Sequence, residues 1–281
     1  MGCKLSGGDW LRYSVSIWSD IRRTGDERRL PHPAVYPAAL VQRLLQCYCW
    51  ADRAVVLDPF LGSGTTLVAA AQAGFGGVGF DVVPDNARLA YSRLQALQLP
   101  LAASTPAPQP HLITSPLHLT LPSDAAPLYV VQDDARRLRQ YLDEDSIDIA
   151  ITSPPYWCIL GRKAGVLHRP PSPYSALDDD LGNIDDYQRF LDELGAAFAG
   201  VRAVLKPGAY CIVVVMDLRQ GPRFIPYHMD IAARLDGVGL TLQDILIWDR
   251  RAEYNNLVPL GYGRRFIINK VHEYVMVFQK K

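Results

Sequence analysis

The chain has 281 residues, of which 49% are hydrophobic and 21% are charged, and its 29 basic and 29 acidic residues give zero net charge. This length allows one large domain with a well-buried core or two small ones. The composition excludes a disordered chain, which would be less apolar and more strongly charged. Zero net charge argues against a protein that coats nucleic acid without specificity, although a local basic groove is compatible with it.

The cysteines and the apolar segments indicate a cytoplasmic protein. The five cysteines are scattered and odd in number, and no CxxC pair indicates zinc. The N-terminal segment MGCKLSGGDW lacks the apolar core of a signal peptide. No apolar stretch approaches the ~20 residues that span a bilayer. We therefore expect no disulfide framework, no bound metal ion and no membrane contact.

Short apolar runs alternate with amphipathic segments along the chain. The predicted strands cover residues 54–58, 76–81, 128–134, 146–153, 209–217, 240–248 and 272–280. The predicted helices cover residues 65–73, 84–97 and 185–205. Strands buried on both faces and separated by helices predict an α/β fold with a mostly parallel sheet, here of seven strands. The last two strands leave no room for a crossover helix, so we expect an antiparallel pair at the C-terminus.

Residues 100–127 differ in composition from the rest of the chain. They are rich in Pro, Ser, Thr and Ala and almost uncharged. This composition predicts a flexible or polyproline-like insertion between the helix over 84–97 and the strand over 128–134.

Residues 56–66 read VLDPFLGSGTT, which predicts a strand, a glycine-rich turn and a helix. Gly62 and Gly64 allow the backbone to turn sharply and to approach a ligand closely, and the following helix N-terminus offers unpaired N–H groups. Asp58, directly before the turn, would repel a pyrophosphate and attract an ammonium or sulfonium group. The turn lacks the lysine of a phosphate-binding P-loop and the third glycine of the dinucleotide fingerprint.

Acidic residues end three successive predicted strands, at Asp58, Asp81 and Asp134. An acid at the position of Asp81 typically accepts hydrogen bonds from ribose hydroxyls, and Asp134 could face an adenine amino group. Together the three acids indicate an adenosine ligand with a cationic tail. The alternative is that they are ordinary acids in turns at strand ends.

Residues 152–157 read TSPPYW and follow the fourth predicted strand. Proline lacks the N–H donor of a sheet ladder, so the segment must leave the sheet in an extended, stiff form. It places the Ser153 hydroxyl, backbone carbonyls and the Tyr156 ring where α/β folds bind ligands, at the carboxyl end of a central strand. A proline-rich loop exit without function is the alternative.

DPFLGSGTT together with SPPYW resembles the amino-methyltransferases of DNA, which modify cytosine N4 or adenine N6, and in particular their beta group. Further similarity lies in His32-Pro33-Ala34 with the helix up to Cys49, and in HEYVMVFQK at 272–280. The resemblance spans nearly the whole chain apart from residues 100–127. In the beta group the SPPY half comes first, whereas here the DPF half leads. The two halves can form the same sheet in either order along the chain, because a fold tolerates circular permutation at a surface loop.

The resemblance implies a single Rossmann-like methyltransferase domain over residues 1–281 that binds S-adenosyl-L-methionine. Residues 30–99 form its cofactor-binding half and residues 128–281 its catalytic half. The implied cofactor-binding residues are His32, Asp58, Pro59, Phe60, Gly62, Ser63, Gly64, Thr65, Asp81 and Asp134. The implied catalytic residues are Ser153, Pro154, Pro155 and Tyr156.

The resemblance also implies a mechanism. The Ser153 hydroxyl and the Pro154 carbonyl accept hydrogen bonds from the amine, which localises its lone pair, while Tyr156 stacks on a base flipped out of the duplex. Serine at the first position resembles the cytosine-N4 branch more than the adenine-N6 branch. Methylation at cytosine C5 needs a cysteine nucleophile, usually after proline, and here Cys158 follows Trp157.

The expected partner is DNA, with which the protein would associate in the nucleoid, and a cognate restriction endonuclease is a further candidate. The loop between the last two strands carries the predicted DNA contacts, which are Arg250, Arg251, Arg264 and Arg265. Two other basic segments are candidates, at residues 158–183 and 22–29. The alternatives in function are adenine-N6 methylation, guanine-N2 methylation of RNA, and a catalytically silent cofactor-binding scaffold.

Overall fold

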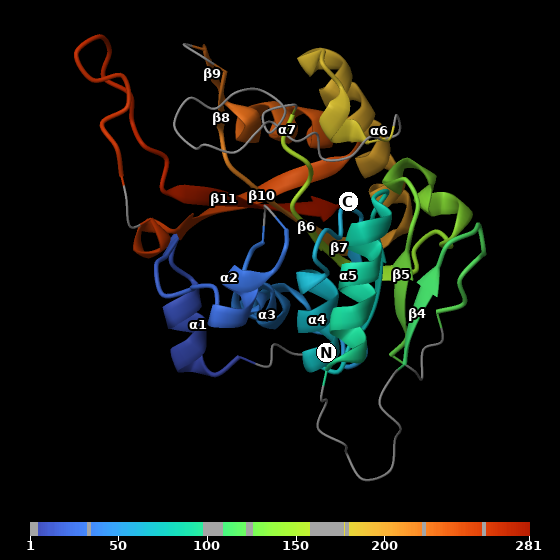
Figure 1. Cartoon of the computed structure of the whole chain (residues 1–281). Coiled ribbons are helices and arrows are strands. Elements are labelled where there is room, and N and C mark those ends of the chain that lie inside the picture. Colours follow the sequence, from blue (N-terminus) through green and yellow to red (C-terminus); the bar gives the residue numbers. More distant parts are fainter. Residues whose placement is uncertain are drawn as a thin grey trace.

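The computed structural model describes residues 5–32, 35–97, 109–121, 126–157, 177, 180–220, 223–254 and 257–281. Within these ranges, a nine-stranded sheet has the order β1-β10-β11-β7-β6-β2-β3-β5-β4 (Figure 1). Its strands are β1 (Ile17–Trp18), β2 (Val55–Asp58), β3 (Gly76–Phe80), β4 (Pro110–Ile113), β5 (Leu128–Val131), β6 (Ile147–Thr152), β7 (Leu205–Val215), β10 (Leu240–Asp249) and β11 (His272–Lys280). A separate hairpin joins β8 (Leu218–Gln220) to β9 (Arg223–Ile225).

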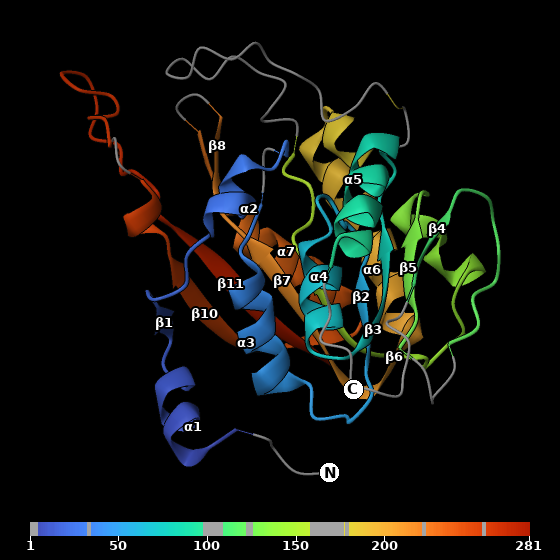
Figure 2. The ribbon, with the colours of Figure 1, turned by 60° about the horizontal axis from the view of Figure 1, so that its bottom comes forward.

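Helices cover both faces of the sheet. They are α1 (Gly7–Tyr13), α2 (Gly25–Arg29), α3 (Ala38–Tyr48), α4 (Thr65–Gln72), α5 (Pro84–Gln95), α6 (Tyr187–Val204) and α7 (Tyr227–Gly237), with 3-10 turns η1 (Ala135–Gln140), η2 (Leu181–Asn183) and η3 (Arg251–Glu253). Figure 2 shows α3, α4 and α5 on one face and α6 and α7 on the other. The core follows this division, because Val56 of β2 packs with α3 whereas the neighbouring Leu57 packs with α6. None of the helices in these ranges is long and apolar enough to cross a membrane.

Strand direction brings the functional segments to one edge of the sheet. β2, β3, β5, β6 and β7 run parallel to one another. β11 is antiparallel to both β7 and β10, so β10 points the same way as β7. The carboxyl ends of these parallel strands, together with that of β10, therefore lie at one edge, which we call the carboxyl edge. The segments that carry the predicted site residues leave the sheet there.

The sheet has two strands more than the sequence predicts. β1 is only two residues long and pairs with the outer side of β10. β4 lies inside the segment predicted to be a flexible or polyproline-like insertion, and this prediction is wrong for Pro110–Ile113. Proline is tolerated there because it is the first residue of an edge strand. The predicted antiparallel pair at the C-terminus is confirmed as β10 and β11.

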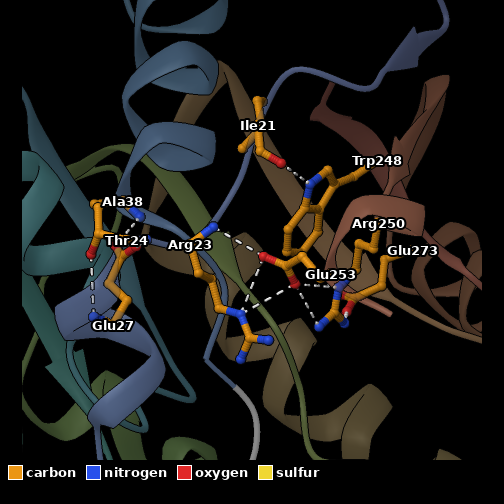
Figure 3. A network of polar contacts seen from close by, with 9 residues as sticks. All are labelled: Ile21, Arg23, Thr24, Glu27, Ala38, Trp248, Arg250, Glu253 and Glu273. Carbon is orange, nitrogen blue, oxygen red and sulfur yellow. Dashed lines mark hydrogen bonds and ion pairs between the residues drawn. The ribbon is translucent and has the colours of Figure 1, made fainter. Parts of the chain in front are cut away.

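A buried carboxylate fixes the chain between α2 and α3. Thr24 and Glu27 form a capping box at α2, in which the Thr24 N–H donates to Glu27 Oε2 at 2.7 Å. The Ala38 N–H, at the start of α3, donates to Glu27 Oε1 at 2.7 Å (Figure 3). The Glu27 side chain thus links the start of α2 to the start of α3. The segment between these two helices carries His32 and Tyr36, which lie at the carboxyl edge.

A second polar network fastens the same N-terminal segment to the sheet. Glu253 accepts hydrogen bonds from the Arg23 backbone and side chain and from Arg250 (Figure 3). Arg250 also pairs with the buried Glu273 of β11. The Trp248 indole donates to the Ile21 carbonyl at 3.1 Å. Residues that are more than 200 positions apart in sequence are thereby joined.

Replacing Glu27 by alanine should lower the free energy of unfolding by about 3 kcal/mol, because two backbone N–H groups lose a charged acceptor in a buried place. Denaturant unfolding of both proteins measures the change. Asp26→Ala on the same helix is the matched control, since the Asp26 side chain is 94% exposed, and it should change stability by less than about 0.5 kcal/mol. Equal effects of the two substitutions would contradict the bridging role of Glu27.

Candidate functional site

A pocket with an empty volume of about 820 Å³ opens at the carboxyl edge. It is lined by the glycine turn (residues 59–64, after β2) and by the double-proline turn (residues 153–157, after β6). The ends of β3 and β5, η2 and the segment before α3 complete the wall. The lining residues from these segments are His32, Tyr36, Pro59, Phe60, Leu61, Gly62, Ser63, Asp81, Val82, Val83, Asp134, Ala135, Ser153, Pro154, Pro155, Tyr156, Asp180 and Leu181, with Thr65, Phe80 and Asn86 beside them. The two turns that the sequence singles out therefore share one pocket.

The Asp58 side chain links the two turns through hydrogen bonds. Its Oδ1 accepts from the Thr152 hydroxyl at 2.5 Å and from the Phe60 N–H at 3.1 Å. Its Oδ2 accepts from the Thr66 hydroxyl at 2.6 Å and from the Tyr36 hydroxyl at 3.1 Å. Burial raises the pKa of Asp58 above its ordinary value, and the hydrogen bonds from these neighbours lower it.

Asp58 therefore has a structural role in this fold, and its predicted contact with the cofactor stays a prediction. The side chain is fully buried and does not line the pocket. Four donors from four segments occupy its two oxygens. The sequence places an acid before the turn correctly, but it does not reveal that neighbouring hydroxyls turn this acid inward.

Both glycines of the glycine turn have positive φ, as the sequence predicts. Gly62 has φ +52° and donates its N–H to Asp81 Oδ2 at 2.7 Å. Gly64 has φ +82° and lies against α5, where an added Cβ would come within 2.7 Å of the Ala90 Cβ. Gly64 is not among the lining residues, and its small size allows α4 to pack closely on α5.

Arg93 of α5 supports the glycine turn from outside the pocket. Its guanidinium donates to the Ser63 carbonyl at 2.5 Å and to the Thr65 hydroxyl at 3.2 Å. Burial lowers the pKa of Arg93 from its ordinary value. Ser63 and Thr65, both predicted as cofactor-binding residues, line the pocket with their conformation held by this contact.

Asp81 lines the pocket at the end of β3. Its oxygens accept from Gly62, from the Val83 N–H at 2.9 Å and from the Asn86 amide at 3.2 Å. Burial raises the pKa of Asp81 to about 7, against the hydrogen bonds that lower it. The carboxylate is thus rigidly held and changes its charge near neutral pH.

Asp134 lines the pocket at the end of β5 and is nearly buried. It caps η1 by accepting from the Arg136 N–H at 2.8 Å, and it accepts from the Arg136 guanidinium as well. Arg136 also forms an ion pair with Glu193 of α6. This pairing orients the carboxylate at the pocket wall.

Four residues of the double-proline turn, from Ser153 to Tyr156, line the pocket. Among the described residues, neither the Ser153 hydroxyl nor the Pro154 carbonyl has a hydrogen-bond partner, whereas the Pro155 carbonyl accepts from the Tyr227 hydroxyl of α7 at 2.9 Å. Trp157 is buried, donates from its indole to the Asp185 carbonyl at 3.2 Å and packs on Tyr187. Trp157 thus anchors the end of the turn while Ser153 and Pro154 remain able to accept hydrogen bonds.

The predicted DNA-contact arginines differ in their surroundings. Arg250 is paired with Glu253 and Glu273 and lies over the Trp248 ring, so its place is structural. Arg251 is exposed and paired with Asp249. Arg264 and Arg265 are exposed on the loop before β11.

The other two predicted basic segments give a mixed result. Residues 158–176, 178 and 179, as well as Pro33 and Ala34, lie outside the described residues. In the segment 22–29, Arg23 pairs with Glu253 and Arg29 with Asp26, while Arg22 and Arg28 are exposed.

The pocket includes residues that the sequence does not single out. Tyr36 reaches it from the segment before α3, Asn86 from the first turn of α5, and Asp180 and Leu181 from η2. Burial raises the pKa of Tyr36 well above its usual value. Of these residues, only Asn86 could have been predicted from the sequence, because it lies in the first turn of the helix that follows Asp81, the acid at the end of β3. No group of metal-ligating side chains occurs within the described ranges.

Comparison with known proteins identifies the family. The family model described as DNA methylase, of the N6 and N4 methyltransferases, matches residues 9–92 and 147–281. The chain belongs to the DNA methylase family. Its two matched parts include both turns of the pocket and leave out β4 and β5.

Relatives of this chain are similar to it over limited segments. The Type II methyltransferase M.ScaI of Streptomyces caespitosus is 39% identical over 28% of this chain and 26% of its own. The Type II methyltransferase M.MthZI of Methanothermobacter thermautotrophicus is 39% identical over 30% of this chain and 24% of its own. The chain thus spans about a quarter of the length of these relatives.

A solved structure also matches part of this chain. A protein of Thermus thermophilus, named as a DNA modification methylase and solved with S-adenosyl-L-methionine, has a TM-score of 0.38 and 29% identity. The match covers 52% of this chain and 53% of that chain.

The charge of Asp81 should make adenosine-ligand binding depend on pH. On the prediction that Asp81 binds the ribose, its ionised carboxylate would accept hydrogen bonds from the hydroxyls, and protonation below pH 7 would remove acceptor capacity. The affinity for S-adenosylhomocysteine should therefore fall about tenfold from pH 8 to pH 6, as expected for a pKa near 7. Calorimetric titration across this range measures it. Asp81→Asn should bind more weakly with a flatter pH profile, and an unchanged profile in this variant would refute the assignment to Asp81.

Proposed function

We propose that this protein transfers the methyl group of S-adenosyl-L-methionine to an exocyclic amino group in DNA, at N4 of cytosine. The observation that carries the proposal is the single pocket lined by both the glycine turn and the double-proline turn. Membership of the DNA methylase family supports the reaction class. Ser153 at the first position of the SPPY sequence supports cytosine N4 over adenine N6, through its resemblance to the N4 branch.

The residues of the pocket fit the proposed cofactor. The pocket combines apolar side chains with a few polar groups in its wall, as small-molecule sites do. In the proposed complex the Asp81 carboxylate would accept from ribose hydroxyls and Asp134 from the adenine amino group, while Phe60, packed against Phe198, would offer an apolar surface. When bound, the cofactor supplies a methyl carbon made electrophilic by its sulfonium sulfur.

The double-proline turn would prepare the amine for attack. An exocyclic amine is a weak nucleophile because its lone pair is delocalised into the ring. Hydrogen bonds from this amine to the Ser153 hydroxyl and the Pro154 carbonyl would favour a pyramidal nitrogen with a localised lone pair. Ser153 and Pro154 would hold the nitrogen in line with the methyl carbon that the cofactor supplies, S-adenosylhomocysteine would be the leaving group, and the surplus proton of the nitrogen would pass to water. Positioning by the turn supplies much of the acceleration.

Tyr156 would hold the base. Its ring lines the pocket beside Ser153 and packs at 6.1 Å from the Tyr227 ring, which fixes its orientation. A base that reaches this ring must leave the duplex stack. The proposal therefore includes DNA as the partner, bound along the carboxyl edge. Since M.ScaI and M.MthZI are Type II methyltransferases by name, it also includes a cognate restriction endonuclease.

One experiment tests the proposed function. The protein is incubated with DNA of varied sequence and methyl-labelled S-adenosyl-L-methionine, and the DNA is digested to nucleosides for identification. N4-methylcytosine supports the proposal, and N6-methyladenine moves it to the other branch of the family. Label in RNA but not in DNA, or no incorporation at all, would overturn it, the second result favouring a silent scaffold.

Ser153→Ala should lower turnover about 100-fold, because a positioned acceptor of the amine is lost. The affinity for S-adenosylhomocysteine should stay within about twofold, since Ser153 acts on the base and not on the cofactor. Ser92→Ala, which removes an exposed hydroxyl on α5, is the matched control and should change neither quantity. Full turnover of Ser153→Ala would remove Ser153 from the catalytic machinery.

A further inference from the structure

Two aromatic side chains on the loop before β11 are almost fully exposed to solvent. We call this segment, residues 257–271, the tip loop. Phe266 is 92% exposed and Tyr262 is 87% exposed, with Ile268 and Leu257 also exposed. Figures 1 and 2 both show the tip loop reaching away from the body of the fold. Apolar surface gathered in this way marks a binding surface more often than it is accidental.

The end of the tip loop is an ordered turn. Gly261 and Gly263 have φ of +72° and +75°. The Arg264 and Arg265 N–H groups both donate to the Gly261 carbonyl, at 3.0 and 2.8 Å. A Cβ on Gly261 would come within 2.2 Å of the Arg265 carbonyl oxygen, so the turn requires glycine. The turn that directly precedes Phe266 therefore has a defined backbone conformation.

The base of the tip loop is fastened to the sheet. Its N-terminal end follows η3, where Glu253 binds both Arg23 and Arg250, and Arg250 binds Glu273 on β11 (Figure 3). At its other end, the Asn269 amide donates to the Val258 carbonyl at 2.8 Å and bridges the two sides of the loop. The loop therefore projects from a fixed base rather than from a free stretch of chain.

The charge of the tip loop favours a polyanion. Residues 257–271 contain Arg264, Arg265 and Lys270 and no acidic residue. Lys270 lies over the Phe224 ring at 4.3 Å, and Arg219 lies over the same ring at 5.7 Å, which brings the β8–β9 hairpin beside the loop base. These cations follow β7 and β10 at the carboxyl edge, where the pocket opens. A nucleic-acid backbone matches this charge and this position.

We propose that Phe266 inserts between bases of the DNA duplex and takes up the space beside the flipped target base. This inference rests on the proposed function. A base amine can reach Ser153 only after leaving the stack, which costs free energy. Apolar wedges inserted between base steps offset that cost in DNA-bending proteins. Arg264 and Arg265, adjacent in sequence, would hold the phosphates on either side of the inserted ring.

Phe266→Ala tests the insertion by comparing two substrates. Both are duplexes containing the site located by the labelling experiment, one fully paired and one with a mismatch at the target base. Single-turnover methylation by Phe266→Ala should be about tenfold slower than that of the unmodified protein on the paired duplex. On the mismatched duplex, where opening costs less, the two proteins should agree within about twofold.

Trp10→Ala is the matched control, because Trp10 is an exposed aromatic on α1, away from the carboxyl edge (Figure 2). It should leave both rates unchanged. Equal slowing of Phe266→Ala on the two duplexes, or no slowing on either, would overturn the insertion and leave the loop as a surface for a second copy or a membrane. Absence of DNA methylation by the unmodified protein would instead overturn the proposed function, and the insertion with it.

Discussion

The hydrogen bonds to the buried Asp58 carboxylate are the interaction on which the site depends. A carboxylate withdrawn from water is costly unless donors replace its hydration. Here Thr152, Phe60, Thr66 and Tyr36 supply those donors, each from a different segment. Because each donor is held by one carboxylate, β2, β6, α4 and the segment before α3 cannot shift independently. The two turns above Asp58 therefore behave as one rigid body.

Further supports act on that rigid body from both faces of the sheet. Arg93 of α5 holds the glycine turn at Ser63, and Tyr227 of α7 holds the double-proline turn at Pro155. Gly64 lets α5 approach closely enough for the first contact. Preorganisation of this kind matters for methyl transfer, since the reacting atoms must lie close together and in line. In the proposed methyl transfer, the helices that cover the sheet would thus contribute by holding the two turns in place.

Hydrophobic pattern and turn chemistry predict the centre of this fold from the sequence. β2, β3, β6, α4 and α5 lie within a few residues of their predicted bounds, because long apolar runs bounded by glycine or proline leave few alternatives. β1 is too short to carry a pattern, and β4 is hidden by its proline. α7 did have a signal, the buried Tyr227, Ile231 and Leu235 at intervals of four residues.

The sequence predicts which residue types form the site, but it does not predict the direction in which their side chains point. The sequence indicates that acids stand at the ends of β2, β3 and β5, but only the fold shows that Asp58 points inward while Asp81 and Asp134 face the pocket. Arg250 is a similar case, because its partners Glu253 and Glu273 lie on different elements. Such choices depend on contacts between distant segments, which no local pattern contains.

The pairing of β1 with β10 has a consequence for how the protein is made. Ile17 lies opposite Ile247, so β1 can pair only after β10 has left the ribosome. Contacts this distant in sequence form slowly and leave apolar surface exposed in the meantime. Trp18 and Ile21, both buried in the finished fold, are therefore exposed during translation until β10 is available. This delay gives a physical reason for aggregation of the nascent chain through the segment around β1.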